Sequence, residues 1–182
     1  MLHQVGTSRH IDTTLTWKHH IGELTSRLNK ACYAIRSIKP FMSLDILRST
    51  YFSYAHSIIS YGIIFWGNSF YSEDIFKIQK IIIRIMNSSR NASCRQLFKY
   101  INILPIQSQY IYSLLLLLKI KTNLCLTQVH QINTRKTSHL YVPTAILNIY
   151  QNGVYYSGIN IYSHLPTAIK DFFYSLEEYF NT

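Results

Sequence analysis

Acidic residues are scarce in this sequence. Its 182 residues include 8 aspartates and glutamates against 18 lysines and arginines, which gives a net charge of +10 with histidine neutral. No carboxylate lies within residues 75–170, whereas 11 lysines and arginines do. A surface whose charges are all positive raises the local electrostatic potential and attracts negatively charged molecules. The sequence therefore favours a polyanionic partner, either nucleic acid or anionic lipid.

The shortage of carboxylates also argues against a catalytic site. A two-metal polymerase or nuclease needs carboxylates that converge on two ions about 4 Å apart. The adjacent acidic pairs are Glu73 with Asp74 and Glu177 with Glu178. Glu73 and Asp74 follow Ser72 at the start of an apolar-periodic stretch, where negative charge complements the helix dipole. We therefore predict that this chain is not an enzyme and has no catalytic residues.

Metal, cofactor and nucleophile motifs are missing as well. The three cysteines, Cys32, Cys94 and Cys125, form no C-x-x-C pair and are expected to be reduced residues of an intracellular protein. His19 and His20 are adjacent, so on a helix they point about 100° apart and do not readily bind one ion. The sequence has no H-x-x-x-H, G-x-S-x-G or phosphate-loop motif. We predict no metal site, no cofactor and no small-molecule substrate.

Long apolar runs are also lacking. The N-terminus has no stretch of signal-peptide length, and the strongly apolar residues 110–118 reach about half of a bilayer span. We therefore expect an intracellular protein, nuclear or cytoplasmic, without a transmembrane segment. The composition, 48% hydrophobic and 14% charged, is typical of a globular chain with a buried core.

Apolar spacing predicts a mainly α fold, a bundle of about five to six helices. Residues recur at intervals of three and four over 20–38, where Pro40 ends the pattern, and again over 43–59 and 72–86. Further helices are expected at 93–100, at 106–123 and after Pro166. Tyrosines alternating with glycines predict a short irregular or hairpin segment near residues 141–165. We expect three parts: residues 1–19, a helical domain at 20–126 and an extension at 127–182.

The expected helix at 72–86 has the clearest separation of faces. At 100° per residue its isoleucines at 75, 78, 82 and 85 fall within about 80° of one another. Lys77, Lys80 and Arg84 fall within about 60° on another side. One face is therefore predicted to pack while the other presents cations.

Aromatic residues are abundant, with 15 tyrosines, 9 phenylalanines and 2 tryptophans. Such side chains can stack on bases beside a basic groove. Tyr51 and Tyr54 have the spacing of a helix core, however, and Tyr61, Phe65 and Trp66 lie in the apolar run YGIIFWG. We expect these five to pack, with Phe65 and Trp66 as buried anchors, and leave the role of Tyr155 and Tyr156 open.

Ordered sequence matches cover most of the chain beyond Ile11. Together they resemble the region after the palm in reverse transcriptases of jockey-like non-LTR retrotransposons. The matching segments are IDTTLTWKHHI at 11–21, YAHSIISYGIIFWGNS at 54–69, IQKIIIRIMN at 78–87, SCRQLFKYINILPI at 93–106, NTR at 133–135 and GINIYSHLPTAIK at 158–170.

This resemblance implies a C-terminal piece of a reverse transcriptase. Residues 1–19 would be a degenerate remnant of the palm-to-thumb connection, 20–126 a thumb-like domain and 127–182 a C-terminal extension. The family's polymerase carboxylates lie upstream, in a Y-x-D-D-like turn that this chain lacks. The segment QVGTSRHID at 4–12 departs from the family's Y-L-G-V-x-x-D strand, and only Asp12 clearly corresponds, which suggests a degenerate genomic copy.

Three hypotheses follow for function. The first is a truncated reverse transcriptase remnant that binds the backbone of RNA or an RNA–DNA duplex without reading sequence. Its expected contacts are Lys77, Lys80 and Arg84, with Arg27 and Lys30 on the first helix as further candidates. The second is an inert helical structural or interaction fragment that self-associates through exposed apolar faces. The third is a peripheral binder of anionic membranes.

Overall fold

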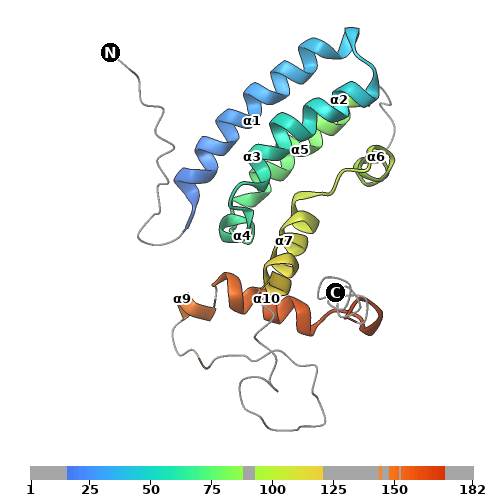
Figure 1. The fold of residues 1–182 in the computed structure, drawn as a ribbon. Helices are drawn as coiled ribbons and strands as arrows, with labels where there is room; N and C mark the ends of the chain where they lie inside the picture. Colours follow the sequence, from blue (N-terminus) through green and yellow to red (C-terminus); the bar gives the residue numbers. More distant parts are fainter. Residues whose placement is uncertain (1–15, 88–92, 121–143, 145–147, 152, 171–182) are drawn as a thin grey trace. The chain divides into compact units, whose positions relative to one another are not determined.

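The computed structural model describes residues 16–87, 93–120, 144, 148–151 and 153–170. Within these ranges the chain is mainly helical and has no strand, which confirms the expected mainly α class (Figure 1). Two compact units, Met1–Gln109 and Tyr110–Thr182, are described in turn. Residues 1–15 of the predicted connection at 1–19, and the predicted domain boundary between residues 126 and 127, lie outside the described residues.

The first long helix of unit 1 is α1 (Lys18–Ile38), close to the predicted 20–38. Its buried residues are spaced three and four apart, so one face of the helix is apolar: Ile21, Leu24, Leu28, Ala31, Cys32 and Ile35. A short 3₁₀ turn, η1 (Lys39–Phe41), follows and contains Pro40. Proline cannot continue the α-helical hydrogen bonding, so α1 ends where the sequence predicted.

The predicted helix at 43–59 is continuous but changes its winding midway. It consists of α2 (Leu44–Thr50), the π-helical η2 (Tyr51–His56) and α3 (Ser57–Ser60). Four of its buried residues, Leu47, Tyr51, Ala55 and Ile59, are each four positions apart, and Ile58 is buried as well. In an α-helix a step of four advances the side chain by about 40°, so Ile59 would lie about 120° from Leu47. A π turn holds more residues per turn and reduces this drift, which keeps the four residues on the core side. Tyr54, expected to pack inward, is instead 40% exposed.

The YGIIFWG segment forms a tight turn followed by the single helical turn α4 (Ile63–Trp66). Gly62 adopts φ 67°, a left-handed conformation that glycine reaches without a Cβ clash. Trp66 is 1% exposed, and its Nε1 donates to the Tyr61 carbonyl over 3.2 Å, so this predicted anchor is buried. The predictions for Phe65 and Tyr61 are wrong, because these side chains are 55% and 51% exposed, with Phe65 stacked on Trp17.

Helix α5 (Ser72–Met86) packs along α1 and against the α2 segment (Figure 1). After it comes α6 (Cys94–Ile101), which begins with Ser93 accepting a hydrogen bond from the Gln96 amide. Asn102 ends α6 in a left-handed conformation that asparagine tolerates at this position. Unit 1 closes with the first residues of α7 (Ile106–Ile120).

A buried glutamine ties these elements together. Gln79 of α5 is 0% exposed, and its Nε2 donates to the Tyr51 hydroxyl over 2.8 Å and to the Leu104 carbonyl over 3.0 Å. Its Oε1 accepts from the Ile106 amide over 3.0 Å. Burial around this network raises the pKa of Tyr51 to about 12. The connection between α6 and α7 is thus fixed to the core by polar contacts.

Unit 2 contains the remainder of α7, α9 (Asn148–Gln151) and α10 (Val154–Ser163). Leu118 packs with Ile159 and Tyr162, with Leu115, Tyr155 and Leu165 around them. A Cβ on Gly158 would lie 3.2 Å from Leu118 Cγ, so the glycine lets α10 approach α7 closely. The continuous apolar run at 114–118 does not mean uniform burial, because Leu116 is 46% exposed.

The hairpin or irregular segment predicted near residues 141–165 is wrong for the described residues there. Residues 148–151 and 154–163 are helical, because positions 155, 158, 159 and 162 have helical spacing and pack on α7. Gly153 precedes α10 instead of breaking it, and its carbonyl accepts from the Ser157 amide. The helix expected after Pro166 is present at residues 167–170.

Candidate nucleic-acid interface

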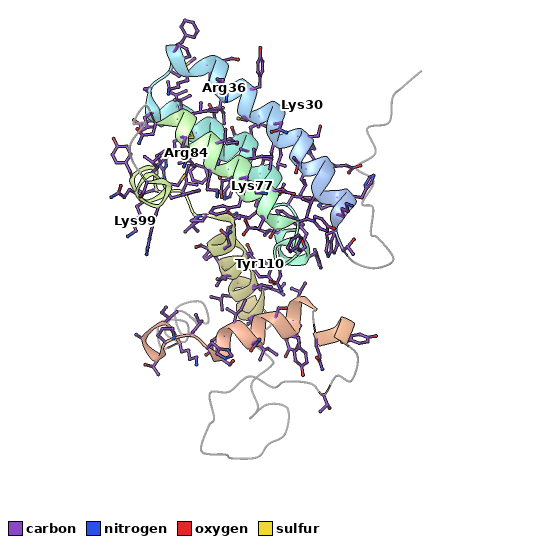
Figure 2. All side chains as sticks on the ribbon, turned by 180° about the vertical axis from the view of Figure 1, so that it is seen from behind. Lys30, Arg36, Lys77, Arg84, Lys99 and Tyr110 are labelled. Carbon is purple, nitrogen blue, oxygen red and sulfur yellow. The ribbon has the colours of Figure 1, made fainter. Side chains whose placement is uncertain are left out.

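Helix α5 buries one face and exposes cations on the other. Its buried residues are Ile75, Ile78, Gln79, Ile82, Ile83 and Met86. Lys77 and Arg84 are exposed and Lys80 is half-buried. Figure 2 shows Lys77 and Arg84 on α5. Seven residues at the rise of an α-helix separate their backbone positions by about 10 Å along the axis. The structure therefore keeps the three predicted cations together on the solvent side of one helix.

Lys80 is held in place by aromatic side chains instead of a carboxylate. Its Nζ lies 4.4 Å from the centre of the Phe76 ring, a distance at which the cation is attracted to the ring face. Phe76 in turn stacks on Phe98 of α6, with ring centres 6.2 Å apart. This contact orients the ammonium group without using its hydrogen-bond donors, which remain available to an anion.

Lys77 is partly neutralised within its own helix. Its Nζ donates to Asp74 Oδ1 over 2.8 Å. The hydrogen bond and charge of Asp74, with a smaller contribution from Glu73, raise the pKa of Lys77. Residues 75–170 contain no carboxylate, but Asp74 immediately precedes them and supplies this counterion. Asp74 therefore lies in the first turn as predicted, and a phosphate at Lys77 has to compete with it.

The candidates on α1 do not join the α5 face. Arg27 and Lys30 are exposed on α1, outside the face formed by its buried residues. Because α1 and α5 pack through their buried faces, their exposed faces point to different sides of unit 1 (Figure 2). Glu23 lies one turn before Arg27, and its Oε1 is 3.8 Å from His19 Nδ1. The negative charge of Glu23 lowers the positive potential on this part of α1. The five predicted residues thus divide into a set of three and a set of two.

Two further cations lie on α6, and sequence reasoning did not select them. Arg95 and Lys99 are exposed, one turn apart, on the side opposite the buried Leu97, Phe98 and Ile101. Figure 2 shows Lys99 on α6, beside α5. Their four-residue spacing around an apolar stripe was a signal that could have identified them.

Another polar contact of unit 1 joins His56 to Gln109 and bears on how stability should depend on pH. His56 Nε2 lies 2.8 Å from Gln109 Nε2 in a half-buried setting. Burial lowers the pKa of His56 below 6.5, although the hydrogen bond to Gln109 opposes this shift. The unfolded chain therefore binds a proton more readily than the folded chain as the pH falls below about 6.5, and this costs stability.

We accordingly expect unit 1 to be less stable at pH 5.5 than at pH 7.5. Urea unfolding followed by tryptophan fluorescence measures the difference. His56→Gln should make the difference smaller, whereas His164→Gln, at an exposed histidine of unit 2, should leave it unchanged. An equal pH dependence in wild type and His56→Gln would contradict this assignment.

Two features of the described residues bear on other functions. No group of three or more histidine, cysteine, aspartate or glutamate side chains is placed to hold a metal ion there. Nor is any single described helix both long and apolar enough to cross a membrane; α6 and α7 meet that standard only as a bent pair. Comparison of the chain with known protein families, curated proteins and solved structures found no match.

Proposed function

We propose that this chain binds the sugar-phosphate backbone of nucleic acid through the exposed face of α5, without reading base sequence. The observation that supports this most directly is the grouping of Lys77, Lys80 and Arg84 opposite a fully packed face. A packed helix holds the backbone positions of its cations at fixed spacing, so little backbone conformational freedom is lost when phosphates bind. Phosphate contacts position a protein on nucleic acid but carry no sequence information.

We further propose that the chain derives from a jockey-like reverse transcriptase and does not polymerise by itself. The ordered matches support this origin, and the segment IQKIIIRIMN supplies two of the three proposed contacts, Lys80 and Arg84. A thumb holds the template–primer duplex by its backbone, which agrees with cations on a rigid helix. The preferred ligand in this proposal is RNA or an RNA–DNA duplex.

A second candidate, a self-associating helical fragment, is favoured by a different observation. Several large apolar side chains of unit 1 are strongly exposed, including Phe41 at 82%, Phe70 at 88% and Tyr33 at 74%. Exposed apolar side chains of this size are typical of surfaces that become buried against another protein. Under this alternative the chain would form oligomers by light scattering and would show no affinity for an RNA–DNA hybrid.

The salt dependence of binding tests the proposed function. Each phosphate neutralised contributes roughly 0.7 to 0.9 to the slope of log affinity against log salt. Replacing Lys77, Lys80 and Arg84 together by Gln should therefore flatten the slope for an RNA–DNA duplex by about two units. Fluorescence anisotropy over a salt series gives this slope.

The matched control is Arg27→Gln with Lys30→Gln, which removes charge from the other side of unit 1 and should leave the slope nearly unchanged. An unaltered slope in the α5 variant would reject this face. Sedimentation with anionic vesicles, with the duplex as competitor, distinguishes nucleic-acid binding from the membrane alternative. Vesicle binding that the duplex fails to displace would also reject the proposal.

A further inference from the structure

Helix α6 is fixed to α5 by contacts on its buried face and by contacts of the connection that follows it. Phe98 stacks on Phe76, and Leu97 and Ile101 are buried. The connection after α6 is held by Gln79, through the Leu104 carbonyl and the Ile106 amide, each over 3.0 Å. The exposed side of α6 therefore has a defined position beside the exposed side of α5.

Among the described residues, no ion pair engages the other cations of α5 and α6 as Asp74 engages Lys77. Lys80 stands over Phe76, the residue at which α5 meets α6, and Arg84 follows one turn later on α5. Arg95 and Lys99 are exposed on α6. Neither helix contributes a carboxylate after Asp74, whereas Lys77 is engaged by Asp74 and Arg27 lies near Glu23. These four cations thus have the least compensated charge on α5 and α6.

The described residues of α5 and α6 include three aromatic rings, Phe76, Phe98 and Tyr100, and none of the three is placed for a base to stack on it beside these charges. Phe76 has Lys80 over its ring and Phe98 stacked against it, and Phe98 is only 5% exposed. Tyr100 is 68% exposed, but it lies about 100° around α6 from Lys99. Proteins that hold single strands combine a cationic groove with stacked aromatic rings. A duplex needs no such rings, because its bases already stack on one another and its phosphates face outward.

Resting on the proposed function, we infer that Lys80, Arg84, Arg95 and Lys99 form one phosphate-binding surface across α5 and α6, whose ligand is a nucleic-acid duplex. Each helix contributes a pair of cations one turn apart. Arg95 and Lys99 are thereby assigned a binding role alongside the α5 residues. Tyr100 and the cations of α1 are assigned none.

Binding of the full chain to an RNA–DNA duplex and to the single RNA strand of the same sequence tests this inference. Wild type should bind the duplex about tenfold more tightly than the strand. Arg95→Gln with Lys99→Gln should reduce the duplex salt slope by about 1.5 or more. Arg95→Lys with Lys99→Arg keeps both charges and should retain the wild-type slope. Circular dichroism and thermal unfolding verify that each variant is folded.

The remaining outcomes separate this inference from the proposed function. A slope that changes in the α5 variant but stays at the wild-type value in the α6 variant would overturn the extension onto α6 and leave the proposed function standing. Equal or tighter binding of the single strand, lost in Tyr100→Ala, would overturn the duplex assignment. Absence of duplex binding by the wild-type chain at low salt would refute the proposed function and the inference with it.

Discussion

Replacing Gln79 by leucine is expected to lower the free energy of unfolding of unit 1 by about 3 kcal/mol or more. The leucine fits the apolar surroundings, but it leaves the Tyr51 hydroxyl, the Leu104 carbonyl and the Ile106 amide without their partner. The hydrogen bonds to the Tyr51 hydroxyl and the Ile106 amide are buried, and each buried polar group left unsatisfied costs about 1 to 3 kcal/mol. Urea unfolding monitored by tryptophan fluorescence reports on unit 1, because both tryptophans, Trp17 and Trp66, belong to it.

A double-mutant cycle separates the hydrogen bonds from the change in volume. Tyr51→Phe removes one of the three groups that leucine would strand, so the double variant should lose less than the sum of the two single variants. Gln96→Leu, at an exposed glutamine on α6, should change stability by less than about 0.5 kcal/mol. Equal losses for Gln79→Leu and Gln96→Leu would show that the buried network contributes no stability.

Replacing Trp66 by alanine should also destabilise unit 1, by about 3 to 5 kcal/mol. The indole is 1% exposed, and its Nε1 donates to the Tyr61 carbonyl, which fixes the turn at Gly62. Alanine would leave a cavity and would remove the hydrogen bond to the Tyr61 carbonyl. Urea unfolding followed by circular dichroism measures the loss without depending on the deleted fluorophore.

The neighbouring Phe65 provides a matched comparison for Trp66. It is also aromatic and belongs to the same helical turn, but its ring is 55% exposed. Phe65→Ala should therefore cost less than about 1 kcal/mol, chiefly through its stacking with Trp17. A loss in Phe65→Ala as large as that in Trp66→Ala would mean that burial does not decide the energetics of this turn.

The long helices were predictable because their apolar residues repeat at helical intervals and their ends have standard signals. Pro40 ends α1, and Glu73 and Asp74 lie in the first turn of α5. The π-helical segment was not predicted, because local propensity does not show which residues have to face the same neighbours over several turns. Gln79 was missed for a related reason, since its partners are a tyrosine 28 residues earlier and backbone groups 25 and 27 residues later.

The C-terminal part shows how composition can mislead. Tyrosine and glycine between residues 150 and 162 suggested a hairpin, but Gly158 is needed for the approach of α10 to Leu118. At the candidate site the sequence predicted which cations share α5. It did not predict that Asp74 would pair with Lys77, that α1 would face elsewhere, or that α6 would add two cations. These facts depend on how helices pack against one another.

The π turn at Tyr51–His56 bears on how chains of this kind can differ in length. Such a turn lets a helix absorb one additional residue while the segments before and after it keep their core contacts. Leu47 and Ile59 remain buried on either side of it. A related chain that is one residue shorter here could therefore form an unbroken α-helix and bury the same positions, so a gap at this point of an alignment need not mean a different fold.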